Sequence, residues 1–276
     1  MPQAATAQVV PTTGFWNECH FPGMPLWPGV LQLKMIREMA RRGVHWTRVK
    51  AEFRYALKPG DIIQPCFEWT PGSTVKCNLL KEGTKASTVE GDLTSEPQVT
   101  WRGAHVSASP VLGNEAIARL LPMIPPFRLV DELLANDPER TTTGRLTACP
   151  DWASARDKTG QAIWGQEALL EGANQVAALV MFQRLACLGQ QDQIPVLMRL
   201  EGAFETGLPE ADPYRATDVL VDVTDVKIQR RRVGTGQVRI YSLLDLAGQK
   251  PSQTTFYQGS VKAIFMLLPK AASTTA

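Results

Sequence analysis

The segment Cys19–Leu31, CHFPGMPLWPGVL, holds one histidine together with three prolines and two glycines. Proline and glycine fix the backbone of a turn, and the apolar residues that follow Gly29 recur at a largely helical spacing as far as Met39. A glycine in the first turn of a helix has a backbone N–H that can meet a developing negative charge. The segment therefore predicts a catalytic turn, with His20 beside an oxyanion donor at Gly29, that leads into a helix buried on one side.

The remainder of residues 1–95 is typical of an antiparallel meander. Arg41-Arg42-Gly43 should end the helix, and the pattern then changes to alternation and to short runs of β-forming residues. Turn-forming breaks separate these runs, which cover 49–57, 62–69, 74–80 and 87–93. Residues 96–113 lose this periodicity and gain Ser, Pro and Gly. We therefore expect a first domain over 1–95 and a linker over 96–113.

The second part, 114–276, repeats the order of helix and meander. A short helix is expected after Asn114, a plausible N-cap, and a long helix over 163–188 that Gly189 closes. Strands should follow at 196–204, 218–226, 238–244 and 258–268.

An internal alignment supports a duplication. Residues 49–61 and 200–212 align without a gap, and the identical pairs are Phe53 with Phe204, Leu57 with Leu208, and Asp61 with Asp212. Because both halves also share the same order of elements, we interpret the chain as two copies of one unit.

The motif of residues 20–31, His-Phe-Pro-Gly, then Pro, then Pro-Gly-Val-Leu, resembles that of the hotdog-fold beta-hydroxyacyl-ACP dehydratases. Residues 114–131 are similar to the short helix, Leu-Pro and aromatic-rich strand with which members of the family begin. The resemblance implies an α+β double hotdog, in which two antiparallel sheets each wrap a central helix and join edge to edge, as in a dimer fused within one chain. The first copy would lack the leading helix and strand of the second.

The resemblance also assigns catalytic roles. Dehydration needs a base for the α proton, an acid for the leaving hydroxyl and a donor to the thioester oxygen. His20 and Gly29 match the base and the donor, but the family's acid, fourteen residues beyond the histidine, falls on Lys34. The second half shows the reverse, since Glu171 and Gln175 resemble the family's Glu-x-x-x-Gln and no histidine precedes them at the matching place. Because the family's dimers build each site from both hotdogs, the implied site is a single composite of His20, Gly29 and Glu171, and the pseudo-site at Lys34 should be inactive.

Four further residues are expected at the substrate: Phe21, Trp27, Pro28 and Gln175. Trp27 is most simply explained as a core residue, and Gln175 could orient Glu171 or its water. Glu167, one turn earlier on the same helix, is an alternative acid.

The resemblance implies no metal and no cofactor of the protein's own, because the substrate carries its phosphopantetheine as an acyl carrier protein or coenzyme A thioester. Two other functions stay open. A thioesterase would need the carboxylate on the helix but not His20, and a non-catalytic acyl-binding or partner subunit of another dehydratase would need neither.

The composition excludes several classes of protein. A formal charge of +2 lacks the strong basic bias of a nucleic-acid-binding protein. Five widely spaced cysteines without a CxxC pair argue against a disulfide scaffold or a zinc module and favour a reducing, cytoplasmic setting. No run approaches the roughly 18 apolar residues of a membrane span, so none is expected. Association of several chains into a homo-oligomer stays open.

Overall fold

The computed structural model describes most of the chain. The described residues are 3–21, 23–40, 44–70, 74–95, 108–147, 152, 154–156, 162–189, 193–204, 219–230, 232–244 and 252–267. Of the predicted features, the helix end at Arg41-Arg42-Gly43, most of the linker, and Leu208 and Asp212 of the internal alignment lie outside this set.

The first half consists of a helix-containing N-terminal segment and an antiparallel meander. Its elements are β1 (Gln3–Ala4), β2 (Gln8–Val9), α1 (Phe15–Cys19), α2 (Gly29–Ala40), β3 (His45–Phe53), β4 (Ile62–Trp69), β5 (Thr74–Lys81) and β6 (Thr84–Thr94).

The second half has a longer N-terminal part, a long helix and four long strands. Its elements are α3 (Asn114–Leu120), β7 (Glu132–Asn136), β8 (Thr141–Leu146), β9 (Ser154–Arg156), β10 (Ala162–Trp164), α4 (Gln166–Cys187), β11 (Gln193–Phe204), β12 (Val219–Gln229), β13 (Val233–Leu244) and β14 (Ser252–Leu267).

The two central helices differ in how completely they are buried. On α2 the buried apolar residues Val30, Leu33 and Ile36 follow a helical spacing, so one side of the helix faces the core. On α4 nearly every residue from Gln166 to Met181 is buried. A helix apolar on all sides must be enclosed by the rest of the fold, and Gly189, with φ of 73°, ends it as predicted.

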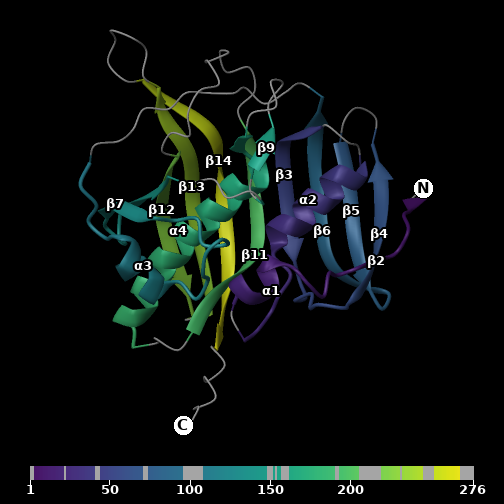
Figure 1. Ribbon diagram of the computed structural model, residues 1–276, viewed down its shortest axis with the longest axis horizontal. Helices are drawn as coiled ribbons and strands as arrows, with labels where there is room; N and C mark the ends of the chain where they lie inside the picture. Colours follow the sequence, from purple (N-terminus) through teal and green to yellow (C-terminus); the bar gives the residue numbers. More distant parts are fainter. Residues whose placement is uncertain are drawn as a thin grey trace.

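Both halves contribute to one continuous antiparallel sheet, and α2 and α4 lie on the same face of it (Figure 1). The strand order is β1-β4-β5-β6-β3-β11-β14-β13-β12-β8-β7, with β2 also pairing with β4. The halves join where β3 pairs with β11, and α2 packs against α4. The predicted α+β double hotdog, with sheets joined edge to edge around two central helices, is confirmed.

The register of the β3–β11 pair agrees with the internal alignment. Lys50 pairs with Glu201, and these are also the residues that the gapless alignment superposes. On either side, Ala51 pairs with Leu200 and Val49 with Gly202. A pseudo-twofold axis therefore passes through this pair, as it would in a symmetric dimer.

Three details of the N-terminal parts differ from expectation. The first half does have a helix, α1, and β1 and β2 pair with β4 as β8 pairs with β12, so its leading strand is shortened rather than missing. Asn114 is the first helical residue of α3 and not its cap, which is Gly113. Its side chain instead accepts a hydrogen bond from Arg128 at 2.7 Å.

The aromatic-rich strand that the resemblance implies at the end of residues 114–131 is absent from 125–131, all of which the structure describes. Pro125 and Pro126 have no N–H to offer a ladder, and the N–H groups of Leu129 and Val130 donate to the side chain of Gln175. The strand β7 begins only at Glu132. A side-chain acceptor from α4 thus takes the place of a neighbouring strand.

Candidate active site

His20 follows the last residue of α1 and is held there by two hydrogen bonds. Its backbone N–H donates to Trp16 O at 2.9 Å, and its Nδ1 lies 2.8 Å from Leu26 O. A carbonyl oxygen only accepts, so Nδ1 carries the proton and Nε2 has a free lone pair. The turn therefore selects the tautomer in which Nε2 can act as a base.

Aromatic rings enclose the imidazole. The ring centroids of Phe21 and Phe127 lie 4.2 Å and 4.8 Å from that of His20. Phe21 adopts φ of 60°, an uncommon left-handed conformation for a residue with a side chain. Burial lowers the pKa of His20 to about 4, against the opposing effect of its hydrogen bond to Leu26. The imidazole is therefore neutral at neutral pH.

Glu171 lies in the second turn of α4 and is only 5% exposed. Burial raises its pKa to about 8, and the side-chain amides of Gln175 and Asn174 act in the opposite direction. The carboxyl group is therefore mostly protonated at neutral pH, which is the form that can donate a proton.

Gln175 lies behind Glu171 and connects it to the segment before β7. Its Nε2 donates to Glu171 Oε1 at 2.9 Å and to Phe127 O at 2.8 Å, while its Oε1 accepts from Leu129 N at 2.7 Å. All polar atoms of this fully buried side chain are thus engaged with the protein. Gln175 supports the carboxyl group from behind and is not part of the cavity wall described next.

His20, Gly29 and Glu171 line one cavity of about 120 Å³. Phe21 and Trp27 also line it, whereas Pro28 does not. Most of the remaining wall is apolar, and the second half supplies much of it: Met123, Ala177, Ala178, Met181, Pro195, Val196, Leu197, Met198, Val261, Ala263 and Ile264. Such a wall suits an acyl chain.

Gly29 is the first residue of α2, so its N–H has no acceptor within the helix. A Cβ atom at this position would lie 2.7 Å from Cζ of Phe53. The close approach of the Phe53 ring therefore explains why glycine stands here, and it sets the position of the helix N-terminus relative to the cavity.

Glu167, the alternative acid, is engaged elsewhere. Arg37 on α2 donates from Nε to Glu167 Oε1 at 2.8 Å and from Nη2 to Oε2 at 3.2 Å, and its Nη1 donates to Val44 O at 2.8 Å. This ion pair is largely buried, and neither Arg37 nor Glu167 lines the cavity. Of the two carboxyl groups on α4, Glu171 is the one at the cavity.

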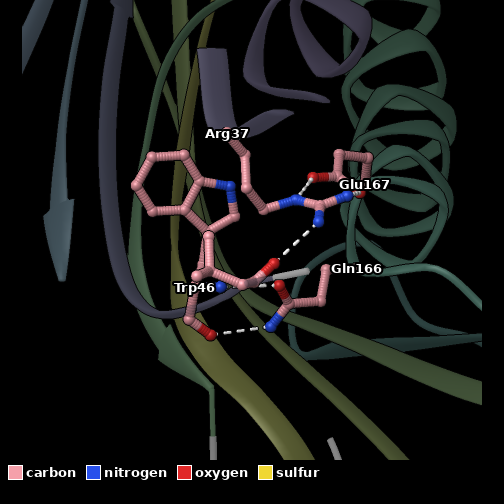
Figure 2. A network of polar contacts seen from close by, with 5 residues as sticks. Arg37, Trp46, Gln166 and Glu167 are labelled. Carbon is pink, nitrogen blue, oxygen red and sulfur yellow. Dashed lines mark hydrogen bonds and ion pairs between the residues drawn. The ribbon is translucent and has the colours of Figure 1, made fainter. Parts of the chain in front are cut away.

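A second contact at the start of α4 strengthens this connection between the halves (Figure 2). Gln166 accepts from Trp46 N at 2.8 Å and donates to Trp46 O at 2.7 Å, so it pairs with the backbone of β3 like a neighbouring strand. The first turn of α4 is thereby fixed to the first half. Glu171, one turn further along, is placed relative to His20 by this attachment.

Lys34, at the family's acid position in the first half, is half-buried on α2 and does not line the cavity. Four polar residues of the cavity wall were not predicted: Gln32, Arg54, Tyr55 and Asn174. Asn174 follows Glu171 by three residues and so shares its face of the helix, a spacing that could have identified it. Gln32 stands three residues after Gly29 in the same way.

The described part of the chain contains neither a candidate metal-binding cluster nor a candidate membrane-spanning helix. It contains no group of three or more His, Cys, Asp or Glu side chains placed to hold a metal ion. None of its helices is both long enough and apolar enough to cross a membrane.

Residues 2–92 match the family model of the ApeI-like dehydratases, described as ApeI dehydratase. No curated protein sequence matches the chain. The matched region is the first half, which contains His20 and Gly29, and the resemblance to hotdog-fold dehydratases is confirmed.

Solved structures resemble the chain over nearly its whole length. The dehydratase domain of PpsC from Mycobacterium tuberculosis, in complex with C12:1-CoA, has a TM-score of 0.61 at 12% identity and covers 96% of this chain and 94% of that chain. An N-terminal dehydratase from the difficidin assembly line has a TM-score of 0.57 at 13% identity, with coverage of 95% and 93%. The acyl-CoA thioesterase II TesB2 from Mycobacterium marinum has a TM-score of 0.52 at 12% identity, with coverage of 85% of each chain. At these identities the likeness establishes the fold.

Proposed function

We propose that this protein removes water from 3-hydroxyacyl thioesters to give trans-2-enoyl thioesters, in one composite site built from both halves of the chain. The observation that carries the proposal is the pairing of His20 and Glu171 on one cavity wall in the protonation states that this reaction needs. The match of the first half to ApeI-like dehydratases supports the same chemistry.

The proposed reaction assigns one step to each group. Nε2 of His20 takes the proton from C2, and that electron pair forms the C2–C3 double bond. Glu171 donates its proton to the 3-hydroxyl, the C3–O bond breaks and water leaves. The Gly29 N–H stabilises the negative charge that develops on the thioester oxygen. Glu171 ends as a carboxylate and His20 as an imidazolium, so a proton must return from one to the other or through solvent before the next cycle.

The apolar wall supports an acyl substrate, and the thioester would be carried by coenzyme A or by the phosphopantetheine of an acyl carrier protein. The protein needs no cofactor of its own for these steps. The four cysteines that the structure describes are free thiols, which fits a cytoplasmic enzyme.

The competing function is thioester hydrolysis, because a thioesterase shares the fold and Glu171 could activate a water. Incubation of the protein with 3-hydroxyacyl thioesters of several chain lengths separates the two. We expect mass spectrometry to show a product lighter by one water with no release of free thiol. Release of free thiol without water loss would support the hydrolase, and a folded protein that changes none of these substrates would support a binding role.

A further inference from the structure

The side-chain amide of Asn174 lies beside Glu171 but makes no well-formed hydrogen bond in the described part of the protein. Its Nδ2 and Oδ1 are both buried, and neither atom makes a hydrogen bond of ordinary length and angle there. Asn174 nevertheless lines the cavity on the same helix face as Glu171, and it is close enough to lower the pKa of that carboxyl group.

A second amide on the cavity wall is partly unpaired in the same way. Gln32, on α2 and 3% exposed, donates from Nε2 to Trp27 O at 3.3 Å. Because a carbonyl only accepts, this bond fixes the orientation of the amide and leaves Oε1 without a donor among the described residues. The cavity therefore has an unused donor and unused acceptors, from helices of opposite halves.

Unpaired amides are costly in such surroundings. Burying a polar group without a hydrogen bond costs roughly 1 to 3 kcal/mol, and most of the remaining wall is apolar. His20, Gly29 and Glu171 already serve the proton, the thioester oxygen and the leaving group, so neither amide is needed by those three roles. A ligand hydroxyl supplies what the amides lack, since it donates one hydrogen bond and accepts two.

We propose that Asn174 binds the 3-hydroxyl group of the substrate beside Glu171, and that it is the residue by which the site distinguishes 3-hydroxyacyl chains from unsubstituted ones. This inference rests on the proposed function. The hydroxyl oxygen accepts from Asn174 Nδ2 and from protonated Glu171, and the hydroxyl proton goes to a free amide oxygen, that of Asn174 or of Gln32. A site built around a hydroxyl rejects the analogue that lacks it, because its buried amide is then left unpaired.

The test compares two unreactive ligands that differ in one hydroxyl. In both, an amide replaces the thioester, so that the weakly acidic α proton is not removed. One carries the 3-hydroxyl and the other is saturated at C3. Calorimetry gives the ratio of their dissociation constants for the wild type, for Asn174→Leu, which has a similar shape, and for Asn78→Leu. Asn78 is also a buried amide but bonds to Thr88 and does not line the cavity.

We expect the wild type to bind the hydroxylated ligand about tenfold more tightly, as one hydrogen bond implies. Asn174→Leu should lower the ratio several-fold by weakening the hydroxylated ligand alone, because only Glu171 then donates to the hydroxyl, and Asn78→Leu should keep the wild-type ratio even if the protein is less stable. A wild-type ratio near one, or an unchanged ratio in Asn174→Leu, would overturn the inference. The proposed function is judged separately by water loss from the thioesters in the wild type, so the two can fail independently.

Discussion

His20 and Glu171 line one cavity from opposite halves of the chain, and burial moves their pKa values in opposite directions, to about 4 and about 8. The imidazole is thus neutral and the carboxyl group protonated over the same range of pH. Neither half contains both groups at the matching positions, since Lys34 takes the place of an acid in the first half. The proposed composite site therefore depends on the joining of the halves, where β3 pairs with β11.

The rate of dehydration should have a broad maximum between the two pKa values. His20 must be unprotonated, so activity is lost as the pH falls toward about 4. Glu171 must be protonated, so kcat should fall about tenfold per pH unit above about 8. A pH profile of kcat measures both limits. If kcat already decreased as the pH rose from 5 to 6, Glu171 would have an ordinary carboxyl pKa and would not be the acid.

In the Gly29→Ala variant the new Cβ would collide with the Phe53 ring and displace the start of α2. Because a small displacement of a catalytic group lowers the reaction rate strongly, kcat should fall by roughly 10- to 100-fold. Adding Phe53→Leu should restore much of the loss by making room. Gly113→Ala is the matched control, since a Cβ there meets nothing within 4 Å and the backbone is not strained. If the second substitution restored nothing, the collision would not be the cause.

Removing one partner of the Arg37–Glu167 pair should destabilise the protein by about 3 kcal/mol or more, because it leaves a charge buried without its counter-ion. Urea denaturation of Arg37→Leu and Glu167→Leu measures this, and the double variant should recover most of the loss. Arg48→Ala provides the contrast, as Arg48 in the Arg48–Asp92 pair is 63% exposed and should contribute less than about 1 kcal/mol. An equal loss of unfolding free energy at the Arg37–Glu167 and Arg48–Asp92 pairs would contradict a buried ionic connection between the halves.

The Gln175→Leu variant should have two separable effects. Loss of its bonds to the backbone of Phe127 and Leu129 should lower the free energy of unfolding by about 2 kcal/mol or more. Loss of its bond to Glu171 removes an influence that lowers the pKa of that carboxyl group, so the alkaline limb of the pH profile should move to higher pH. A limb that moved to lower pH would contradict the role of Gln175 as a donor to Glu171.

Local patterns predicted the central elements of the fold well. The strand Ile62–Trp69 was predicted with its observed bounds, and both central helices were predicted within a few residues. In these elements the apolar residues alternate along the strand or recur at helical spacing along the helix, as expected when one face is buried. The segment 125–131 was misjudged because its backbone N–H groups meet the side chain of Gln175, a partner 45 or 46 residues further along.

The candidate site was predictable only where a motif carried it. His20 and Glu171 stand in recognisable patterns, but the choice between Glu171 and Glu167 depends on Arg37, which is 130 residues from Glu167. The tautomer of His20 depends on one carbonyl of its own turn. The strands β11 and β14 contribute apolar residues to the cavity that no sequence pattern separates from ordinary core.

The central claim is that His20 and Glu171 form one site within one chain. Its most direct test is the rate of water loss from a 3-hydroxyacyl thioester by His20→Ala and Glu171→Gln, each alone and then mixed in equal amounts. We predict that each variant loses a factor of roughly 100 or more and that the mixture recovers nothing, because every chain still lacks one half of its own site. Near wild-type water loss by either variant alone, or recovery of activity on mixing, would contradict the account.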